Sequence, residues 1–178
     1  FVLEKIIKKG YLIADVKLEF DTQGNIKNNY IINGFIKDVN FSFLKKYNLE
    51  KLNFIFNYKQ DNLDLENISF SLNDLNFLSE KIFVKNIKNE FVINGNIEHK
   101  SLDINEGNLE LFIDPLFPDL SIKKLNFSSK NIFSFRLSKK FKIEDFEITS
   151  KMFVDQFSIV NNLELKKFFP KIKEKITF

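Results

Sequence analysis

Apolar and polar residues alternate along much of this chain, and this period of two is the feature that most limits how it can fold. Within residues 52–58 the even positions hold Leu, Phe, Phe and Tyr, whereas Asn53 and Asn57 fall between them. Successive side chains of a β-strand point to opposite faces, so the pattern predicts a strand with one buried face. The same alternation recurs in Phe91/Ile93, Leu102/Ile104, Leu109/Leu111/Ile113, Phe133/Phe135/Leu137 and Phe157/Ile159. We therefore predict a mainly β, antiparallel fold with strands of roughly 6–11 residues.

The alternation changes phase inside two of these runs. Residues 63–66 have their apolar side chains at odd positions and residues 68–72 have them at even positions, which places a slip near Asn67. Residues 141–148 show the same slip. One extra residue in a strand, a β-bulge, keeps the apolar side chains on one face across such a slip. We therefore predict a bulge in each run.

Turn-forming residues separate the runs. They cluster at Asp21–Asn25, Lys59–Asn62, Glu106–Asn108, Asp114–Asp119 and Ser128–Asn131. Pro115 and Pro118 make the fourth cluster the clearest break in the sheet, because proline cannot donate to a strand ladder. Helical signals are few, and we expect one or two short helical turns. The candidates are Val2–Lys9, which also fits a strand, Phe43–Asn48, and Leu163–Phe169 before Pro170.

The chain contains an internal repeat. Residues 26–36 and 87–97 are identical at seven of eleven positions, and looser echoes join 51–54 to 124–127 and 63–71 to 141–149. Recurrent self-similarity favours an elongated array in which each unit packs on the next, although chance matches in a biased composition would also produce echoes. We treat residues 1–178 as a single β-rich segment of a longer repeat rod, with weak repeats around 26–97 and 87–160.

Each copy of the longest repeat contains an Asn-Gly pair, which is a common two-residue hairpin turn. The apolar positions, however, continue in phase across Gly34 and across Gly95. We therefore favour strands that bend at glycine over hairpin turns at these two sites.

Composition excludes several classes of protein. The chain has 178 residues, of which 23 are Phe, with no Cys and a formal net charge of +3. Its aromatic content argues against disorder, and the interspersed charges argue against a nucleic-acid partner. His99 is the single histidine, and we expect it to be exposed and to bind no metal. Ser101 and Asp103 follow it at alternate positions of one strand, where the three cannot form a catalytic triad, so we expect neither an enzyme nor a cofactor.

No apolar run approaches the length of a membrane-spanning helix, and we expect no signal peptide within these residues. Because the first residue is Phe1, we expect the chain to be a piece of a longer polypeptide. The lysine-rich segment Lys166–Lys175 fits contact with anionic lipid headgroups, or simply a solvated face.

Residues 71–97 read S-L-N-D-L-N-F-L-S-E-K-I-F-V-K-N-I-K-N-E-F-V-I-N-G-N-I. This block resembles the repeating unit of the AsmA-like superfamily, which includes TamB and YhdP, and the resemblance extends over residues 11–160. It implies a curled, twisted antiparallel sheet that forms an open groove with an apolar inner face. It also implies a periplasmic protein, anchored in the inner membrane by a segment outside this chain, that conducts phospholipid between the inner and outer membranes.

The resemblance makes phospholipid acyl chains the expected partner and one sheet face the expected site. The candidate groove residues are Leu52, Phe54, Phe56, Leu63, Leu65, Ile68, Phe70, Leu72, Phe91, Ile93 and Ile97. Alternation alone fits equally well with a closed sandwich in which these side chains fill a core. The alternative function is that of a β-rich structural or adhesive module of an extracellular bacterial protein, with no role in transport.

Overall fold

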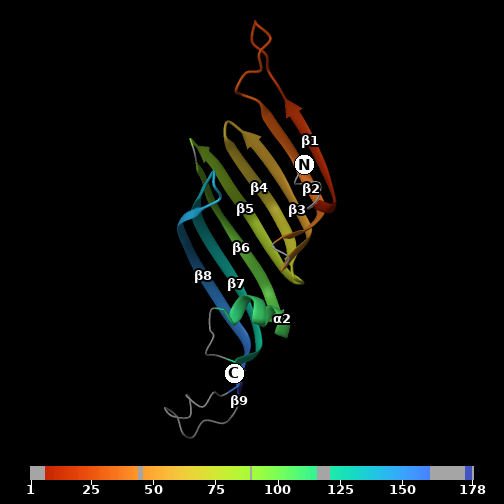
Figure 1. Cartoon of the computed structure of the whole chain (residues 1–178). Coiled ribbons are helices and arrows are strands. Elements are labelled where there is room, and N and C mark those ends of the chain that lie inside the picture. The colour runs from red at the N-terminus through yellow and green to blue at the C-terminus, as the bar shows by residue number, and fades with distance from the viewer. Residues whose placement is uncertain (1–6, 44–45, 89, 116–120, 161–174, 178) are drawn as a thin grey trace. The chain divides into compact units, whose positions relative to one another are not determined.

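The computed structural model describes residues 7–43, 46–88, 90–115, 121–160 and 175–177. Its described residues are mainly β and form one open antiparallel sheet whose strands follow one another in chain order (Figure 1). The strands are β1 (Ile7–Lys17), β2 (Ile31–Phe43), β3 (Tyr47–Lys59), β4 (Asn62–Leu72), β5 (Leu75–Ile87), β6 (Glu90–Ile104), β7 (Ser121–Ser138), β8 (Ile143–Val160) and β9 (Lys175–Thr177). The predicted fold class is therefore confirmed.

The chain divides into two compact units. Unit 1 comprises residues 1–98 and 130–150, and it contains β1 to β5 with most of β6 and parts of β7 and β8. Unit 2 comprises residues 99–129 and 151–178, and it contains the remaining parts of those strands with the helix and β9.

The strands β1 and β4 have 11 residues and lie within the predicted length, whereas the other six of β1 to β8 have 13 to 18 residues and are longer than predicted. The prediction of a turn at Ser128–Asn131 was wrong, because these residues lie inside β7. Their polar groups are satisfied within the sheet: Asn131 Nδ2 donates to the carbonyl of Ile97 at 3.1 Å, and Ser129 Oγ lies 2.8 Å from His99 Nε2. The turns at Asp21–Asn25 and Lys59–Asn62 are present as predicted, and the Asp21 carboxylate accepts the backbone amides of Gln23 and Asn25.

Both predicted phase slips coincide with irregular backbone. Asn67 has a φ of 53°, and the β3–β4 register shifts beside it, between Asn53↔Ser69 and Ile55↔Glu66. Asp145, at the second slip, has a φ of 50°. Asn and Asp tolerate this left-handed conformation better than other residues with a side chain. The bulge predicted at Asn67 is confirmed.

Asparagine side chains from neighbouring strands bind the backbone at other irregular points. Asn53 Oδ1 accepts from the amide of Asp38 at 3.0 Å, and Asn40 Oδ1 accepts from the amide of Lys51 at 2.8 Å. Asp38 and Lys51 each have a φ of 52°, and the β2–β3 register shifts there. The asparagine side chains thus accept hydrogen bonds from backbone amides that the irregular strand ladder does not pair.

The sequence repeats fall on strands that are four places apart in the sheet. The longest pair ends in β2 and β6, the first echo lies in β3 and β7, and the second echo lies in β4 and β8. All three matches therefore describe the same four-strand displacement, and the different residue offsets reflect loops and strands of different length.

Gly34 and Gly95 lie inside β2 and β6, so the choice of strands over hairpin turns is confirmed. A phenylalanine ring from the next strand lies against each glycine, Phe56 against Gly34 and Phe133 against Gly95. A Cβ on Gly34 would overlap the carbonyl oxygen of Ile13 and lie 2.7 Å from Phe56 Cζ. A Cβ on Gly95 would lie 3.0 Å from Phe133 Cζ and 2.8 Å from Ile82 Cγ1.

The predicted strand through Leu109, Leu111 and Ile113 was wrong, because Glu106–Ile113 forms the short helix of the described chain, α2 (Glu106–Asn108) continued by η1 (Leu109–Ile113). Asn105 caps it, since its side-chain oxygen accepts from the amide of Asn108 at 2.9 Å. Helical winding buries Leu109 in unit 2, where Leu102 and Ile104 are also buried. The N-cap asparagine followed by Glu106 was a helix-start signal that alternation obscured.

The three predicted helical segments fall largely on strands or outside the described residues. Tyr47 and Asn48 begin β3, so the described part of Phe43–Asn48 holds no helical turn. Ile7–Lys9 belong to β1, while the rest of Val2–Lys9 and all of Leu163–Phe169 lie outside the described residues.

We predict that Gly34→Ala lowers the free energy of unfolding by about 1–3 kcal/mol, because the added methyl group overpacks against backbone and ring atoms. Gly107→Ala is the matched control, since Asn105 Oδ1 would lie 3.7 Å from the new Cβ. Urea unfolding followed by circular dichroism measures both. Equal stability of the two variants would contradict the packing described for Gly34.

Candidate functional site

The eleven candidate groove residues all lie in unit 1, on β3, β4 and β6. Phe56 of β3 lies opposite Leu65 of β4, and Leu65 lies opposite Ile82 of β5. Leu63 connects in the same way through Val84 to Ile93. Residues directly opposite one another in an antiparallel sheet project from the same face. The structure therefore brings these candidates to one face, which we call the apolar face.

Sequence reasoning missed the contribution of β5, which lies between β4 and β6. Phe77, Ile82 and Val84 of this strand share the apolar face with the candidates. The register with β6 shifts between Leu78 and Ile82, so the alternation on the two sides of this shift is out of phase. The signal that could have found it is the change from odd apolar positions at Leu75 and Phe77 to even ones at Ile82 and Val84. In the fold, Asn96 Oδ1 supports the shift, because it accepts from the amides of Glu80 and Lys81 at 3.1 Å each.

Aromatic side chains contact one another along the apolar face. The rings of Phe54 and Phe56 lie 6.3 Å apart in an edge arrangement. The rings of Phe70 and Phe77 stack at 5.3 Å across the β4–β5 pair. These distances are within the range in which ring pairs add to simple burial. Lateral aromatic contact thus covers part of the apolar area of each residue.

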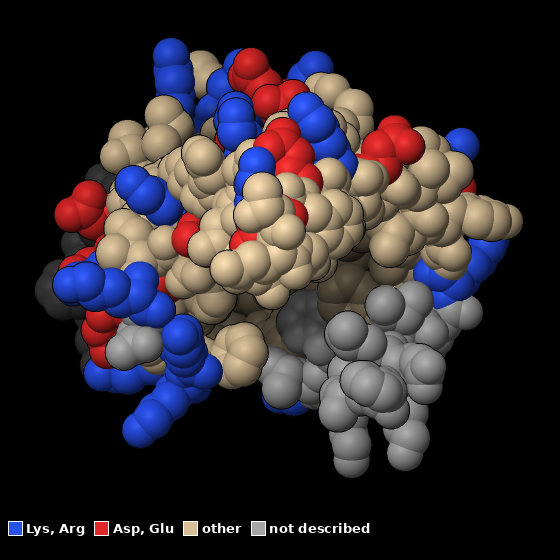
Figure 2. Space-filling view, turned by 90° about the horizontal axis from the view of Figure 1, so that it is seen from above, with Lys and Arg blue, Asp and Glu red and all other residues tan. Residues whose placement is uncertain are grey.

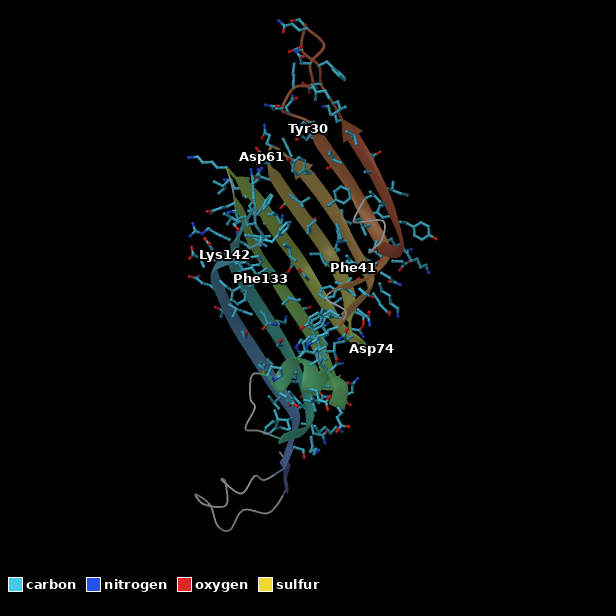
Figure 3. The ribbon with its side chains drawn as sticks, in the orientation of Figure 1. Tyr30, Phe41, Asp61, Asp74, Phe133 and Lys142 are labelled. Atoms are coloured by element: carbon cyan, nitrogen blue, oxygen red, sulfur yellow. The ribbon has the colours of Figure 1, made fainter. Side chains whose placement is uncertain are left out.

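A tyrosine pair lies at the end of β3 nearest the β3–β4 turn. Tyr30, labelled in Figure 3, stacks on Tyr58 with ring centres 5.8 Å apart. The side-chain hydrogen bond with Tyr30, together with partial burial, raises the pKa of Tyr58 to about 12. Figure 3 also shows Asp61 and Asp74 at opposite ends of β4, at the two turns that flank the strand. Polar groups therefore mark both ends of the apolar strands.

Within unit 1 the apolar face is only half-buried. Among the described residues five hydrophobic side chains are buried, and of these five only Ile68 and Leu75 belong to unit 1. Phe56 and Phe70 remain half-buried, as do the other candidates apart from Ile68. Two sheets packed face to face would enclose both inner faces in a core. The described part of unit 1 has instead one layer of strands.

The opposite face of the same strands carries charged side chains together with exposed apolar ones such as Ile55 and Leu78. Lys81 Nζ lies 3.1 Å from Asp64 Oδ1 and 3.2 Å from Glu66 Oε1. Hydrogen bonds to Asp64 and then Glu66 raise the pKa of Lys81. A cavity of about 370 Å³ opens on this side beside Ile55 and Asn57. Figure 2 shows basic and acidic side chains interspersed over the visible surface, with no large area of one sign.

The expectation that His99 is exposed was wrong. Its side chain lies in unit 2 with 5% of its surface exposed, and its ring meets Phe127 edge-on at 4.5 Å. Burial lowers its pKa, because removal from water disfavours the charged imidazolium, while a backbone hydrogen bond with Phe127 acts in the opposite direction. Strand alternation cannot distinguish a buried polar residue from an exposed one, which is why the sequence failed here.

We predict that the protein loses stability as the pH falls below the unfolded-state pKa of histidine, about 6.5. The folded-state pKa of His99 is lower than this value, so the unfolded chain binds the proton more readily and acid favours unfolding. The measurement is the urea midpoint at pH 7.5 and pH 5.0. The His99→Gln variant should show a smaller loss between these pH values, and an identical loss in both proteins would contradict the assignment.

The described residues contain no group of three or more His, Asp or Glu side chains placed to hold a metal ion. Among them there is also no helix long and apolar enough to cross a membrane. Comparison with protein-family models, curated proteins and solved structures finds no match for this chain. The feature that remains as a candidate site is the apolar face.

Proposed function

We propose that this chain is a segment of an AsmA-like periplasmic protein, and that its apolar face binds the acyl chains of phospholipid in transit between the inner and outer membranes. The observation that carries the proposal is the half-buried apolar face of unit 1, built on a single layer of strands. The resemblance of residues 71–97 to the AsmA-like repeat supports the periplasmic setting and an inner-membrane anchor outside this segment.

The chemistry of the face suits an acyl chain. Phe54, Phe56, Leu65 and Phe70 present only carbon and hydrogen, so a hydrocarbon chain lying across them loses no hydrogen bonds. Each Å² of apolar surface that leaves water stabilises the complex by roughly 25 cal/mol. A face without directional polar groups also lets a chain slide, because successive positions along it have similar energies. Conduction needs this property, whereas tight storage does not.

A charged cluster on the opposite face limits lipid to one side of the sheet. Asp64, Glu66 and Lys81 form a charged cluster on the side opposite Leu63 and Leu65. Covering these charges with hydrocarbon would cost their hydration. The proposed lipid path therefore lies on one side of the sheet only. Two neighbouring residues of β3, Phe56 and Ile55, project from opposite sides and test the two sides separately.

We predict that a photoreactive benzoylphenylalanine at Phe56 forms covalent adducts with phospholipid, whereas the same residue at Ile55 does not. Ile55 is the matched control, because it is the adjacent residue, projects from the other face and is 49% exposed. Phe70 provides a second test position on the apolar face. The measurement is mass spectrometry of adducts after illumination of cells that express the protein containing this segment.

Adducts at both Phe56 and Phe70, and none at Ile55, are the expected result. The absence of lipid at both apolar positions would contradict the proposal. Adducts to protein alone at Phe56 would favour the structural or adhesive module instead, because such a module covers its apolar face with another polypeptide.

A further inference from the structure

Both edges of unit 1 expose apolar side chains. At one edge, Val16 of β1 is 56% exposed. At the other edge, Phe141 is 83% exposed and Ile143, the first residue of β8, is 57% exposed. Proteins usually protect sheet edges, because an edge strand is a template for pairing with another strand. Exposed apolar residues at both edges therefore require an explanation.

The four-strand repeat supplies one. The echo places residues 63–71 of β4 in correspondence with residues 141–149 at β8. The neighbour of β4 is β5, and one period earlier the strand that corresponds to β5 is β1. In this repeat β8 corresponds to β4, and β1 corresponds to β5. Because β4 pairs with β5 inside the chain, the repeat predicts that the outer edge of β8 can pair with the outer edge of β1.

The register within the chain confirms that β1 corresponds to β5. Ala14 lies opposite the repeat glycine Gly34, just as Ile82 lies opposite Gly95. One step further, Val16 lies opposite Ile32, just as Val84 lies opposite Ile93. Residues 14–17, A-D-V-K, therefore correspond to residues 82–85, I-F-V-K.

The β4–β5 register can now be transferred to the two edges. The pair Leu63↔Val84 becomes Phe141 opposite Val16, and Leu65↔Ile82 becomes Ile143 opposite Ala14. The pair between them, Asp64↔Phe83, becomes Lys142 opposite Asp15. The transferred register thus places apolar residues opposite apolar residues and a lysine opposite an aspartate. Cross-strand pairs of both kinds stabilise sheets.

We propose that β1 of one copy of this chain pairs antiparallel with residues 141–143, which lead into β8, of a second copy, with Asp15 opposite Lys142. The contact joins two different edges, so it leaves a free edge on each copy and can repeat. Ala14 and Val16 project from the same side as Gly34 and Ile32, and this side carries Phe56 of the apolar face. The junction therefore continues the apolar face from copy to copy, and it forms whether or not that face binds lipid.

Cysteine cross-linking tests the register, because the chain contains no native cysteine. Asp15→Cys protein is mixed with Lys142→Cys protein under mild oxidation. Directly opposite residues in a sheet have Cα atoms about 4.5–5.5 Å apart, which a disulfide spans. We expect a covalent dimer that contains one copy of each variant. Lys142→Cys mixed with Glu50→Cys, an exposed position in the interior strand β3, gives the rate of random collision.

A heterodimer that forms no faster than this control would overturn the proposal. So would a faster dimer of Asp15→Cys with itself, which would indicate that β1 pairs with β1. A single-copy mass in light scattering at high protein concentration, together with absent cross-linking, would overturn it as well.

A charge exchange separates the proposed contact from a fold defect. Asp15→Lys places two lysines opposite each other and should weaken self-association roughly five-fold, the effect of one cross-strand charge pair. Adding Lys142→Asp should restore the association, because the pair is then reversed. Sedimentation velocity measures the association, and far-UV circular dichroism shows that both variants keep their strands. Failure of the double variant to recover, in a folded protein, would contradict the register.

Discussion

The structure of unit 1 depends on one constraint: a single layer of strands must stabilise its apolar face from within its own plane. Ile68 and Leu75 are the buried hydrophobic residues of its described part, and no described side chain in the molecule is completely enclosed. Cross-strand neighbours therefore provide the apolar contacts that a second layer provides in a sandwich. The stacked rings of Phe70 and Phe77 and the ring of Phe56 over Gly34 are examples. The same arrangement leaves apolar surface available for a ligand.

This constraint also explains why side chains from neighbouring strands hydrogen-bond to the backbone at the irregular points of the sheet. A one-residue slip would turn every following apolar side chain to the opposite face. Asn67 and Asp145 adopt left-handed backbone at the two slips, and side chains such as Asn53 and Asn96 bind amides at neighbouring irregularities. The asparagines that look like low-complexity composition in the sequence thus have defined partners in the fold.

The two proposals concern different parts of the sheet and have independent physical grounds. Lipid binding rests on the half-buried apolar face, where hydrocarbon replaces water. Pairing between copies rests on the backbone groups of the edge strands and on the match of Asp15 with Lys142. The two proposals share one consequence: strands that add at the edge in the native register extend the apolar face without a break.

The sequence by itself determined the strand class, the side of the sheet on which Phe56 and Leu65 lie, the bulge at Asn67 and the placement of Gly34 within a strand. These are local properties, because the period of side-chain direction is fixed by the backbone. The tertiary structure decided what local patterns cannot report. Alternation read Leu109–Ile113 as a strand, but the Asn105 cap and burial in unit 2 made it helical. His99 is buried because Phe127 and Ser129, about thirty residues away in sequence, lie beside it. Such long-range contacts leave no periodic trace in the chain, so only the folded sheet reveals them.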